Sequence, residues 1–541
     1  MMTALKRISR LTRAAGELVR HDGLWPAEMG EKPVWLALAG RAARIFDSAS
    51  VPTTSPPHLA LSLEKLGPAY VKLGQNLATR PDIVGPVLAE ALASLQDRLA
   101  PFAEDEARAT VAAELGQPVE ELFDAFGPAV AAASIAQVHR AVARAALGHN
   151  RPPATLAAND DVSPAPPSPR PVAVKVLRPG VEKAFAADLD AFFWAARWIE
   201  RVSPMARRLE PQKLVQTLAD SMALELDLRL EGAAAVELAG NMRGDPQFRV
   251  PRIDWARTSR RVLTLEWIDG IPIDDRDALI AAGHDPVKLG TAVLQSFLTQ
   301  VLRDGYFHAD LHQGNVFVDA EGRLVAVDFG IMGRLDAASR RYLAEILMGF
   351  LTRNYKRIAE VHFEAGYVPA RHSVDVFAQA LRAIGEPIFG RPASDISMAR
   401  LLGQLFETTA MFDMHLRPEL VLLQKTMVVA EGVARRLDPE HNLWEAARPV
   451  IERFMTKELG PEARLQSAAE HAASVARLLG DLPGVLRTME RAAAAYAERG
   501  LALDPASIEA LGRAEARASR AERIALVLGM AALAVLAIAL L

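Results

Sequence analysis

The stretch His308-Ala-Asp-Leu-His-Gln-Gly-Asn315, followed by Asp328-Phe-Gly330, decides how this chain of 541 residues folds. Asp310 lies five positions before Asn315, and Asp328 lies thirteen positions after it. Carboxylate and carboxamide oxygens are hard ligands suited to Mg²⁺, so Asn315 and Asp328 are candidate metal ligands. Asp310 is placed to accept a proton from a nucleophile. The spacing therefore predicts a site that handles phosphate groups together with Mg²⁺.

Two other interpretations of this stretch remain open. His308, Asp310 and His312 alternate, so they could line the exposed face of a turn or form the His/Asp metal cluster of a hydrolase. The spacing nevertheless matches the H-R-D-x-x-x-x-N catalytic loop and the D-F-G metal-binding motif of protein kinases. Two motifs in the right order are a more specific signal than either one alone.

The residues between the two motifs predict a hairpin. Residues 315–318 and 324–327 are short runs rich in β-branched side chains, separated by the turn sequence Asp319-Ala-Glu-Gly322. Paired strands would bring Asn315 and Asp328 to neighbouring ends, where both can reach one ion.

A lysine in an apolar strand gives a second half of the predicted site. Residues 171–177 read as a strand with the form Val-Ala-Val-Lys175, which fits the V-A-I-K pattern of kinases. The alternative is an edge lysine whose ammonium reaches water. Since burying an unpaired ammonium is costly, a strand this apolar favours an anionic partner for Lys175.

A helix with acidic residues offers that partner. Residues 211 to about 242 predict one long helix with Pro211 in its first turn. Asp227 and Glu231 share a face at i and i+4, where like charges cost roughly 0.2–0.5 kcal/mol and favour a nearby cation. Glu225 stands four residues before Arg229, so a solvated acidic face remains the alternative for Glu225.

An alanine-rich run stands where kinases carry a glycine-rich loop. Residues 131–139 read Ala-Ala-Ala-Ser-Ile-Ala-Gln-Val-His in place of G-x-G-x-x-G. Alanine does not adopt the positive φ angles that glycine adopts freely. We therefore expect a stiffer turn that cradles phosphates with Ser134 and backbone N–H groups. By composition alone, the run would be an ordinary helix.

A helix without a counterpart in ordinary kinases is expected between Pro68 and Pro81. Leu73 and Leu77 mark its expected buried side. Gly74 costs about 1 kcal/mol relative to alanine in a helix, which a close approach by another group would explain. The alternative is a tolerated surface glycine. The expected polar stripe of this helix consists of Lys72, Gln75, Asn76 and Thr79.

Taken together, five ordered motifs over about residues 60–340 resemble the UbiB family of atypical kinase-like proteins. They are Lys72-x-Gly-Gln75, the alanine-rich run, Val-Ala-Val-Lys175, Glu225-x-Asp227 and His-Ala-Asp310. The resemblance implies a two-lobed, kinase-like α+β fold in which an N-terminal helical segment covers the active site, in the place where a protein substrate would bind. It also implies ATP hydrolysis and a part in ubiquinone biosynthesis rather than protein phosphorylation.

The resemblance also implies a role for each site residue. Lys175 would contact the nucleotide and pair with Glu231, and Asp310 would accept the proton. Asn315 and Asp328 would bind Mg²⁺. The carboxylates of Glu225 and Asp227 would meet the helix of Lys72 and Gln75. The implied ATP-binding residues, besides Lys175, are Val130, Ala131, Ala132, Ala133, Ser134, Ile135, Ala136, Gln137 and Val138.

Length and composition are consistent with a large, multi-part protein. The chain is 50% hydrophobic, has a net charge of −4 and contains no cysteine. These values give no sign of nucleic-acid binding and exclude disulfides and thiol catalysis. The predicted parts are an N-terminal helical extension at 1–125, an N-lobe at 126–268 with a flexible insertion at 148–170, a C-lobe at 269–450, C-terminal helices at 451–522 and a transmembrane anchor at 523–541.

Both ends of the chain suggest contact with membranes. Residues 524–541 form an uncharged run of 18 residues that would span about 27 Å as a helix, close to a bilayer's hydrocarbon thickness. Arginines precede it, which favours a cytoplasmic catalytic domain on a bacterial inner membrane, or alternatively a mitochondrial inner membrane. A buried C-terminal helix is the other interpretation. The basic segment 1–20 is expected to be an amphipathic helix on anionic lipid, a transit peptide or a solvated helix.

Three functions follow as hypotheses. The first is a membrane-anchored ATPase that supports ubiquinone synthesis, with membrane lipids or ubiquinone precursors and the biosynthetic enzymes as partners. The second is a conventional kinase acting on a protein or small molecule, which the lack of an A-P-E segment disfavours. The third is a nucleotide-sensing scaffold without turnover.

Overall fold

The computed structural model describes residues 58–78, 100–144, 169–202, 210–387, 411–414 and 417–459, with residues 7, 10, 13, 14, 17, 92, 95, 404, 407 and 408. The chain divides into two compact units, Met1–Thr456 and Lys457–Leu541, and nearly all described residues belong to the first. Within the described ranges, no helix is long and apolar enough to cross a membrane. The expected anchor at 523–541 and almost all of the expected insertion at 148–170 lie outside the described residues.

Residues 123–266 contribute the strands of an antiparallel sheet in the order β1-β2-β3-β5. The strand predicted at 171–177 is confirmed as β3. Side chains of β3 alternate: Val172, Val174 and Val176 pack against helices α7 and α8, whereas Ala173 packs on the opposite side. Lys175 follows the same alternation as Ala173, so it lies on the face of β3 opposite Val174 and Val176. The strands are β1 (Phe123–Ala132), β2 (Ala136–Ala143), β3 (Arg170–Leu177) and β5 (Val262–Glu266), and the helices are α7 (Glu104–Leu115) and α8 (Val119–Leu122).

The alanine-rich run is a β-hairpin and not a helix. It forms the end of β1, a tight turn and the start of β2, with Ala132 paired to Gln137. The turn is closed by a hydrogen bond of 2.8 Å from Ala133 N to Ala136 O. Pairing of β2 with β3 along its whole length offers these backbone groups partners that override the helical propensity of alanine.

The expected single helix over 211–242 is wrong, because the chain forms two helices there. Helix α11 (Pro211–Glu225) ends, and α12 (Leu228–Asn241) begins after Asp227. Asp227 has φ −122° and ψ 92°, and its carboxylate accepts a hydrogen bond from Arg229 N. This is an N-cap, which satisfies a free N–H at the start of α12. Asp227 therefore does not lie inside a helix four residues before Glu231.

Helix α4 (Pro68–Ala78) begins at the predicted proline, but its burial differs from the prediction. Lys72 is buried at 9% exposure, whereas Leu73 and Leu77 are only half-buried. The close approach expected at Gly74 is confirmed: a Cβ there would lie 2.4 Å from Leu95 Cδ1. Helices α3 (His58–Leu66) and α9 (Val181–Val202) pack against α4.

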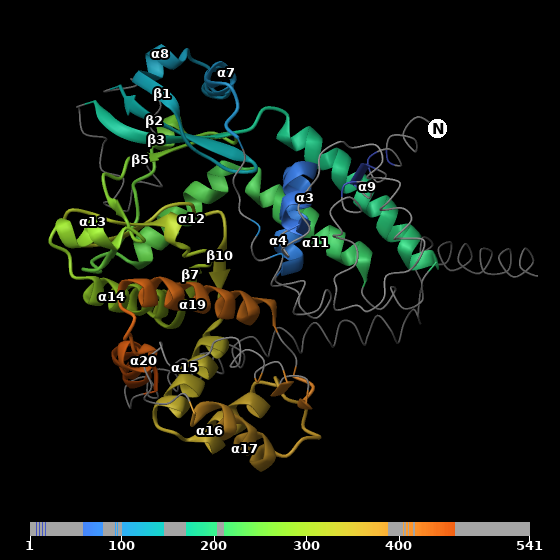
Figure 1. Cartoon of the computed structure of the whole chain (residues 1–541), viewed down its shortest axis with the longest axis vertical. Helices are drawn as coiled ribbons and strands as arrows, with labels where there is room; N and C mark the ends of the chain where they lie inside the picture. Colours follow the sequence, from blue (N-terminus) through green and yellow to red (C-terminus); the bar gives the residue numbers. More distant parts are fainter. Residues whose placement is uncertain are drawn as a thin grey trace, which may run out of the picture. The chain divides into compact units, whose positions relative to one another are not determined.

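The rest of the core carries the predicted hairpin. Strands β8 (Val316–Val318) and β9 (Leu324–Ala326) are antiparallel, and they belong to a sheet in the order β4-β9-β8-β6. Helices α14 and α19 lie side by side (Figure 1), and α14 packs against β9. The remaining elements are β4 (Phe248–Arg249), η3 (Trp255–Arg257), β6 (Ile271–Pro272), α13 (Arg276–Ala281), α14 (Pro286–Thr299), the π-helical turn η4 (Gln300–Asp304), β7 (Tyr306–His308), η5 (Gln313–Asn315), β10 (Met332–Arg334), α15 (Ala337–Leu351), α16 (Tyr355–Glu364), α17 (Val374–Gly385), α19 (Pro418–Leu437) and α20 (Leu443–Leu459).

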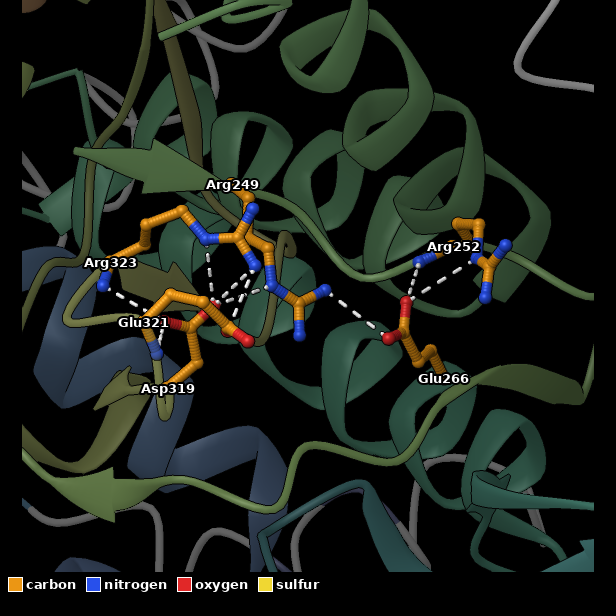
Figure 2. A network of polar contacts seen from close by, with 6 residues as sticks. All are labelled: Arg249, Arg252, Glu266, Asp319, Glu321 and Arg323. Atoms are coloured by element: carbon orange, nitrogen blue, oxygen red, sulfur yellow. Dashed lines mark hydrogen bonds and ion pairs between the residues drawn. The ribbon is translucent and has the colours of Figure 1, made fainter. Parts of the chain in front are cut away.

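A polar network joins this hairpin to the N-terminal sheet (Figure 2). The carboxylate of Asp319, in the β8–β9 turn, accepts hydrogen bonds of 3.0 Å from Arg249 Nε and from Arg323 Nε. Arg249 also donates to Glu266 at the end of β5, over 3.2 Å. Arg249 thus connects a strand of the N-terminal sheet to the hairpin between the two sequence motifs.

Candidate active site

Three predicted site residues meet around one ammonium. Lys175 Nζ, on β3, lies 2.8 Å from Glu231 Oε1 on α12 and 3.1 Å from Asp328 Oδ1. Glu231 also accepts a hydrogen bond of 3.3 Å from the N–H of Phe329. The strand, the helix and the D-F-G sequence are therefore tied together by one cation and two carboxylates, as the sequence predicted for Lys175 and Glu231.

The electrostatics of this cluster keep Lys175 and Asp328 charged. Burial lowers the pKa of Lys175, but the carboxylates of Asp328 and Glu231 outweigh it and raise that pKa above its ordinary range. Burial likewise raises the pKa of Asp328, but the Lys175 ammonium and the N–H of Gly330 hold it well below its usual range. Asp328 is the more accessible carboxylate, with 46% of its side chain exposed against 8% for Glu231. An incoming cation would therefore meet Asp328 first.

The backbone at Asp328 adopts a conformation that few non-glycine residues adopt. Its φ angle is +65°, in the left-handed region. The conformation lets Asp328 Oδ1 accept from Gly330 N at 3.2 Å while the Asp328 carbonyl accepts from His308 Nε2 at 2.7 Å. Such local strain persists only where surrounding contacts determine it, and it is typical of functional sites.

His308 links the two motifs and has a defined tautomer. Its Nδ1 accepts a hydrogen bond from Asp310 N at 3.1 Å, so Nε2 carries the proton that is donated to the Asp328 carbonyl. Burial lowers the pKa of His308, which keeps the ring neutral. The alternation of His308, Asp310 and His312 is thus not a metal cluster. Within the described ranges, no group of three or more His, Asp or Glu side chains could hold a metal ion.

Asn315 lies just before β8, and its backbone carbonyl accepts a hydrogen bond of 2.8 Å from the N–H of Val327, the residue before Asp328. Asn315 ends η5, it is buried at 7% exposure, and its Nδ2 donates to the Asp310 carbonyl over 3.1 Å. The amide orientation leaves Oδ1 of Asn315 as a ligand atom. One amide oxygen and the Asp328 carboxylate are too few ligands for a protein-only cage, but they fit Mg²⁺, which takes its other ligands from phosphates and water.

The alanine-rich turn is held by residues that sequence reasoning missed. Arg178, three residues after Lys175, donates from Nε and Nη2 to the Ala133 carbonyl over 3.1 and 3.0 Å. Arg178 Nη2 also donates to Ala100 O at 2.7 Å, and the guanidinium lies 5.5 Å from the centre of the Phe102 ring. The role of Arg178 could not be predicted from the sequence, because its partners are backbone carbonyls, which every residue has.

The side chains of the turn divide into an exposed and a buried group. Val130 and Ala131 are exposed, whereas Ser134 and Gln137 are buried. Gln137 Oε1 accepts from Phe102 N at 2.9 Å, and Gln137 Nε2 lies 2.8 Å from His139 Nε2. Gln137 therefore anchors the hairpin to the segment before α7.

Helix α4 is tied to α11 by a buried ion pair. Lys72 Nζ lies 2.7 Å from Glu225 Oε2. The Lys72 charge also lowers the pKa of Asp328, so it lies within electrostatic reach of the D-F-G carboxylate. Asp227 instead pairs with Arg229 over 2.7 Å, as part of the cap of α12. Gln75, one turn further along α4, is half-buried.

Comparison with known proteins identifies the family. Residues 94–147 and 166–362 match the ABC1 atypical kinase-like domain, and residues 381–442 match the UbiB helical domain. A relative from Marinobacter nauticus, named "Probable protein kinase UbiB", is 41% identical over 421 residues, which cover 77% of this chain and 73% of the relative. The chain belongs to the UbiB family. A relative of the same name from Xanthomonas campestris pv. campestris is 38% identical over 88% of this chain and 85% of its own length.

The UbiB match confirms the family and the kinase-like α+β fold expected from the motifs. The kinase-like domain encloses Lys175, Glu231, Asp310, Asn315 and Asp328, and the helical domain contains α19. Among solved structures, a Mycobacterium tuberculosis protein in complex with erythromycin has a TM-score of 0.49 and 24% identity, covering 77% of this chain and 97% of that protein.

Proposed function

We propose that this UbiB protein is an ATPase that uses Mg²⁺ and supports ubiquinone biosynthesis at a membrane. The observation that carries the proposal is the position of Lys72. This side chain of α4 is buried against Glu225 and lies within electrostatic reach of Asp328. The buried Lys72–Glu225 pair anchors a helix of the chain itself to α11, and the Lys72 charge acts on Asp328, which supports water over a protein side chain as acceptor.

The segment after the D-F-G sequence supports the same proposal. Kinases that phosphorylate proteins place a long activation segment and an A-P-E motif there. Here β10 begins at Met332, two residues after Gly330, and pairs directly with β7. Asp336 then caps α15, so six residues separate Gly330 from the next helix. This short connection leaves little chain with which to dock a peptide.

The proposed reaction is hydrolysis of the γ-phosphate. Water attacks the γ-phosphorus, the bond from that phosphorus to the oxygen that bridges to the β-phosphate breaks, and ADP and phosphate form. Asp310 accepts a proton from the attacking water. Lys175 neutralises charge on the phosphates, and its ion pair with Glu231 fixes its position. Mg²⁺, held by Asn315 and Asp328, supplies further charge neutralisation when bound.

The cellular setting is part of the proposal. The apolar run at 524–541 and the arginines before it support a single membrane anchor with the catalytic domain in the cytoplasm, at a bacterial inner membrane. Membrane lipids or ubiquinone precursors are then the molecules on which ATP-driven work is done, and ubiquinone-biosynthesis enzymes are the expected protein partners.

The test compares the full-length chain with Asp328→Asn in liposomes and in cells. Released phosphate should fall at least a hundredfold in the variant, and cellular ubiquinone should fall with it. Asp375→Asn is a matched control, because Asp375 is 80% exposed on α17 and far in sequence from both motifs. Normal ubiquinone in Asp328→Asn cells would favour a scaffold without turnover. Labelled phosphate on an acceptor other than water would favour a conventional kinase.

A further inference from the structure

The peptide bond that carries Asp310 is held at both of its polar ends. The Asp310 N–H donates to His308 Nδ1 over 3.1 Å. On its other side, the carbonyl of Ala309 accepts a hydrogen bond of 3.0 Å from the hydroxyl of Thr426. The orientation of this peptide sets the direction in which the Asp310 side chain leaves the backbone.

The neighbouring backbone groups also form hydrogen bonds, and their partners all belong to the kinase-like domain. The Ala309 N–H donates to Ile331 O over 3.0 Å, and the Asp310 carbonyl accepts from Asn315 Nδ2. Thr426 differs from these partners because it belongs to α19, more than 110 residues further along the chain and inside the UbiB helical domain. Thr426 is 1% exposed, so no water competes for the Ala309 carbonyl.

Helix α19 makes a second contact with the same loop. Arg436, ten residues after Thr426, donates to the side-chain oxygen of Gln313. At the end of the helix, Arg276 Nε donates to the Leu437 carbonyl over 3.1 Å. The two loop contacts bracket residues 309–313, so movement of α19 along its axis would disturb both.

The packing of α19 gives these contacts a fixed base. A Cβ at Gly290 of α14 would lie 3.2 Å from the Ala434 carbonyl, so the two helix backbones approach closely. Ala430 and Ala434 are completely buried at this contact. Small residues permit such close approach and leave little freedom for sliding.

We propose that Thr426 is a positioning residue for Asp310, through which the UbiB helical domain orients the catalytic loop. The inference rests on the proposed role of Asp310 in ATP hydrolysis. Thr426 touches no phosphate and no metal ligand in this scheme. Its hydroxyl fixes the Ala309–Asp310 peptide, and its loss leaves a buried carbonyl without that donor.

The test uses Thr426→Val, which keeps the shape of the side chain and removes the hydroxyl, and Thr426→Ser, which keeps the hydroxyl. Thr299→Val is the matched control, because the Thr299 hydroxyl donates to the Gln295 carbonyl within α14 at 2.7 Å. The single proton of the Thr426 hydroxyl is shared between the Ala309 carbonyl at 3.0 Å and the Leu422 carbonyl of its own helix at 2.8 Å. The Thr299 hydroxyl has the intrahelical acceptor, so the two variants differ in the loop contact. Steady-state ATP hydrolysis and amide hydrogen exchange are measured on the full-length proteins.

We expect kcat of Thr426→Val to fall roughly tenfold with KM for ATP within about twofold, because the catalytic loop is displaced while Lys175 and Asp328 keep their contacts. Hydrogen exchange should accelerate in peptides that cover residues 308–315. Thr426→Ser should restore both values, and Thr299→Val should change neither.

Each outcome separates the two proposals. Unchanged exchange at 308–315 in Thr426→Val would overturn the positioning role, whether or not the protein hydrolyses ATP. Equal losses in Thr426→Val and Thr299→Val would also overturn it, because they would reflect helix stability alone. Wild-type protein without ATP turnover would instead overturn the proposed function, while exchange would still report on the loop.

Discussion

Lys72 Nζ on α4 lies 2.7 Å from Glu225 Oε2 on α11, and these two side chains are only 10% and 12% exposed. Removing one member of such a pair leaves the other charge buried without this counterion, which costs roughly 3–5 kcal/mol. We expect Glu225→Gln to lower the free energy of unfolding by about 3 kcal/mol, measured by denaturant titration.

An exposed pair of similar length provides the comparison. Lys213 Nζ lies 2.9 Å from Glu210 Oε2, with side chains 76% and 62% exposed. Because water screens exposed charges, Lys213→Met should change the free energy of unfolding by less than about 1 kcal/mol. Equal effects of the two variants would contradict the assignment of α4 as a helix anchored through Lys72.

Gly74 tests the packing of α4 independently of its charge. A Cβ there would lie 2.4 Å from Leu95 Cδ1 and 2.8 Å from Leu63 Cδ1. We expect Gly74→Ala to destabilise the protein by about 1–3 kcal/mol, since overcrowding forces side chains to move. Gly240 in α12 has no atoms within 4 Å of an added Cβ, so Gly240→Ala should stabilise by about 0.5–1 kcal/mol. Thermal unfolding of both variants in parallel gives the measurement, and stabilisation by Gly74→Ala would contradict the packing.

The sequence was sufficient to predict the parts of the site that depend on local pattern. Short apolar, β-prone runs predicted the Lys175 strand and the β8–β9 hairpin. The motif spacing placed Asp310 and Asn315 in one loop, where the Asn315 amide donates to the Asp310 carbonyl. Each of these predictions depends only on residues that are close together in the sequence, where local patterns indicate the secondary structure.

Other features depend on tertiary contacts and could not be read from the chain. Sheet pairing with β3 overrode the helical propensity of the alanine-rich run. Asp227 caps α12 at a point where Leu228 N bonds to the Arg260 carbonyl, far away in sequence. Arg178 and Thr426 act on carbonyl oxygens, and a carbonyl is present at every residue. No sequence pattern marks such partners.

Arg178 should control the affinity for ATP more than the rate of turnover. Its guanidinium donates to the carbonyls of Ala133 and Ala100, so lysine at this position would lose part of the geometry. With each hydrogen bond worth about 1 kcal/mol, we expect Arg178→Lys to raise KM for ATP roughly tenfold and to change kcat by less than threefold. ATP titrations at steady state measure both constants.

Arg144→Lys is the control for this experiment. Arg144 lies at the far end of β2, where its Nε donates to the Asp124 carboxylate over 2.8 Å with half of its side chain exposed. We expect neither constant to change in this variant. A fall in kcat without a change in KM for Arg178→Lys would mean that the alanine-rich turn does not contribute to nucleotide affinity.

Buried histidines should make the protein less stable in mild acid. Burial lowers the pKa of His139, His308, His362 and His441 from the ordinary value of 6.5. The unfolded chain therefore binds protons that the folded chain excludes as the pH falls below 6.5. The stabilisation is fully present above that pH and is lost as the pH falls toward the lowered, folded-state pKa, with a slope of about 1.4 kcal/mol per pH unit for each neutral histidine.

Replacing one of these histidines should flatten that dependence. His362 lies among aromatic rings, with Nδ1 2.8 Å from the Ile358 carbonyl and its ring centre 5.2 Å from that of Phe377. We expect His362→Phe to reduce the slope between pH 5 and 6.5 by up to about 1.4 kcal/mol per pH unit. Denaturant titrations at four pH values give the slope. An unchanged slope would show that His362 is protonated in the folded protein.

The network around Asp319 should stabilise the junction between β5 and the β8–β9 hairpin (Figure 2). Asp319 is 4% exposed, and its carboxylate accepts from Arg323 N at 2.8 Å as well as from the side chains of Arg249 and Arg323. Asp319→Ala leaves the two guanidinium groups without this anion, so we expect a loss of about 3 kcal/mol in the free energy of unfolding. Asp319→Asn keeps an acceptor for the backbone N–H and should lose about half as much.

The charge of Asp319 makes its stabilising effect depend on pH, but at a lower pH than the effect of the histidines. Burial raises the pKa of Asp319, but the hydrogen bonds from Arg323 and Arg249 outweigh it and hold that pKa below the ordinary 3.8. Its contribution is therefore present above pH 3.8 and is lost as the pH falls through the lower, folded-state value. The stability difference between wild type and Asp319→Asn should stay constant from pH 5 to 8 and narrow below pH 4. If the stability difference between wild type and Asp319→Asn already narrowed between pH 7 and 5, a group other than Asp319 would control the pH dependence of the network.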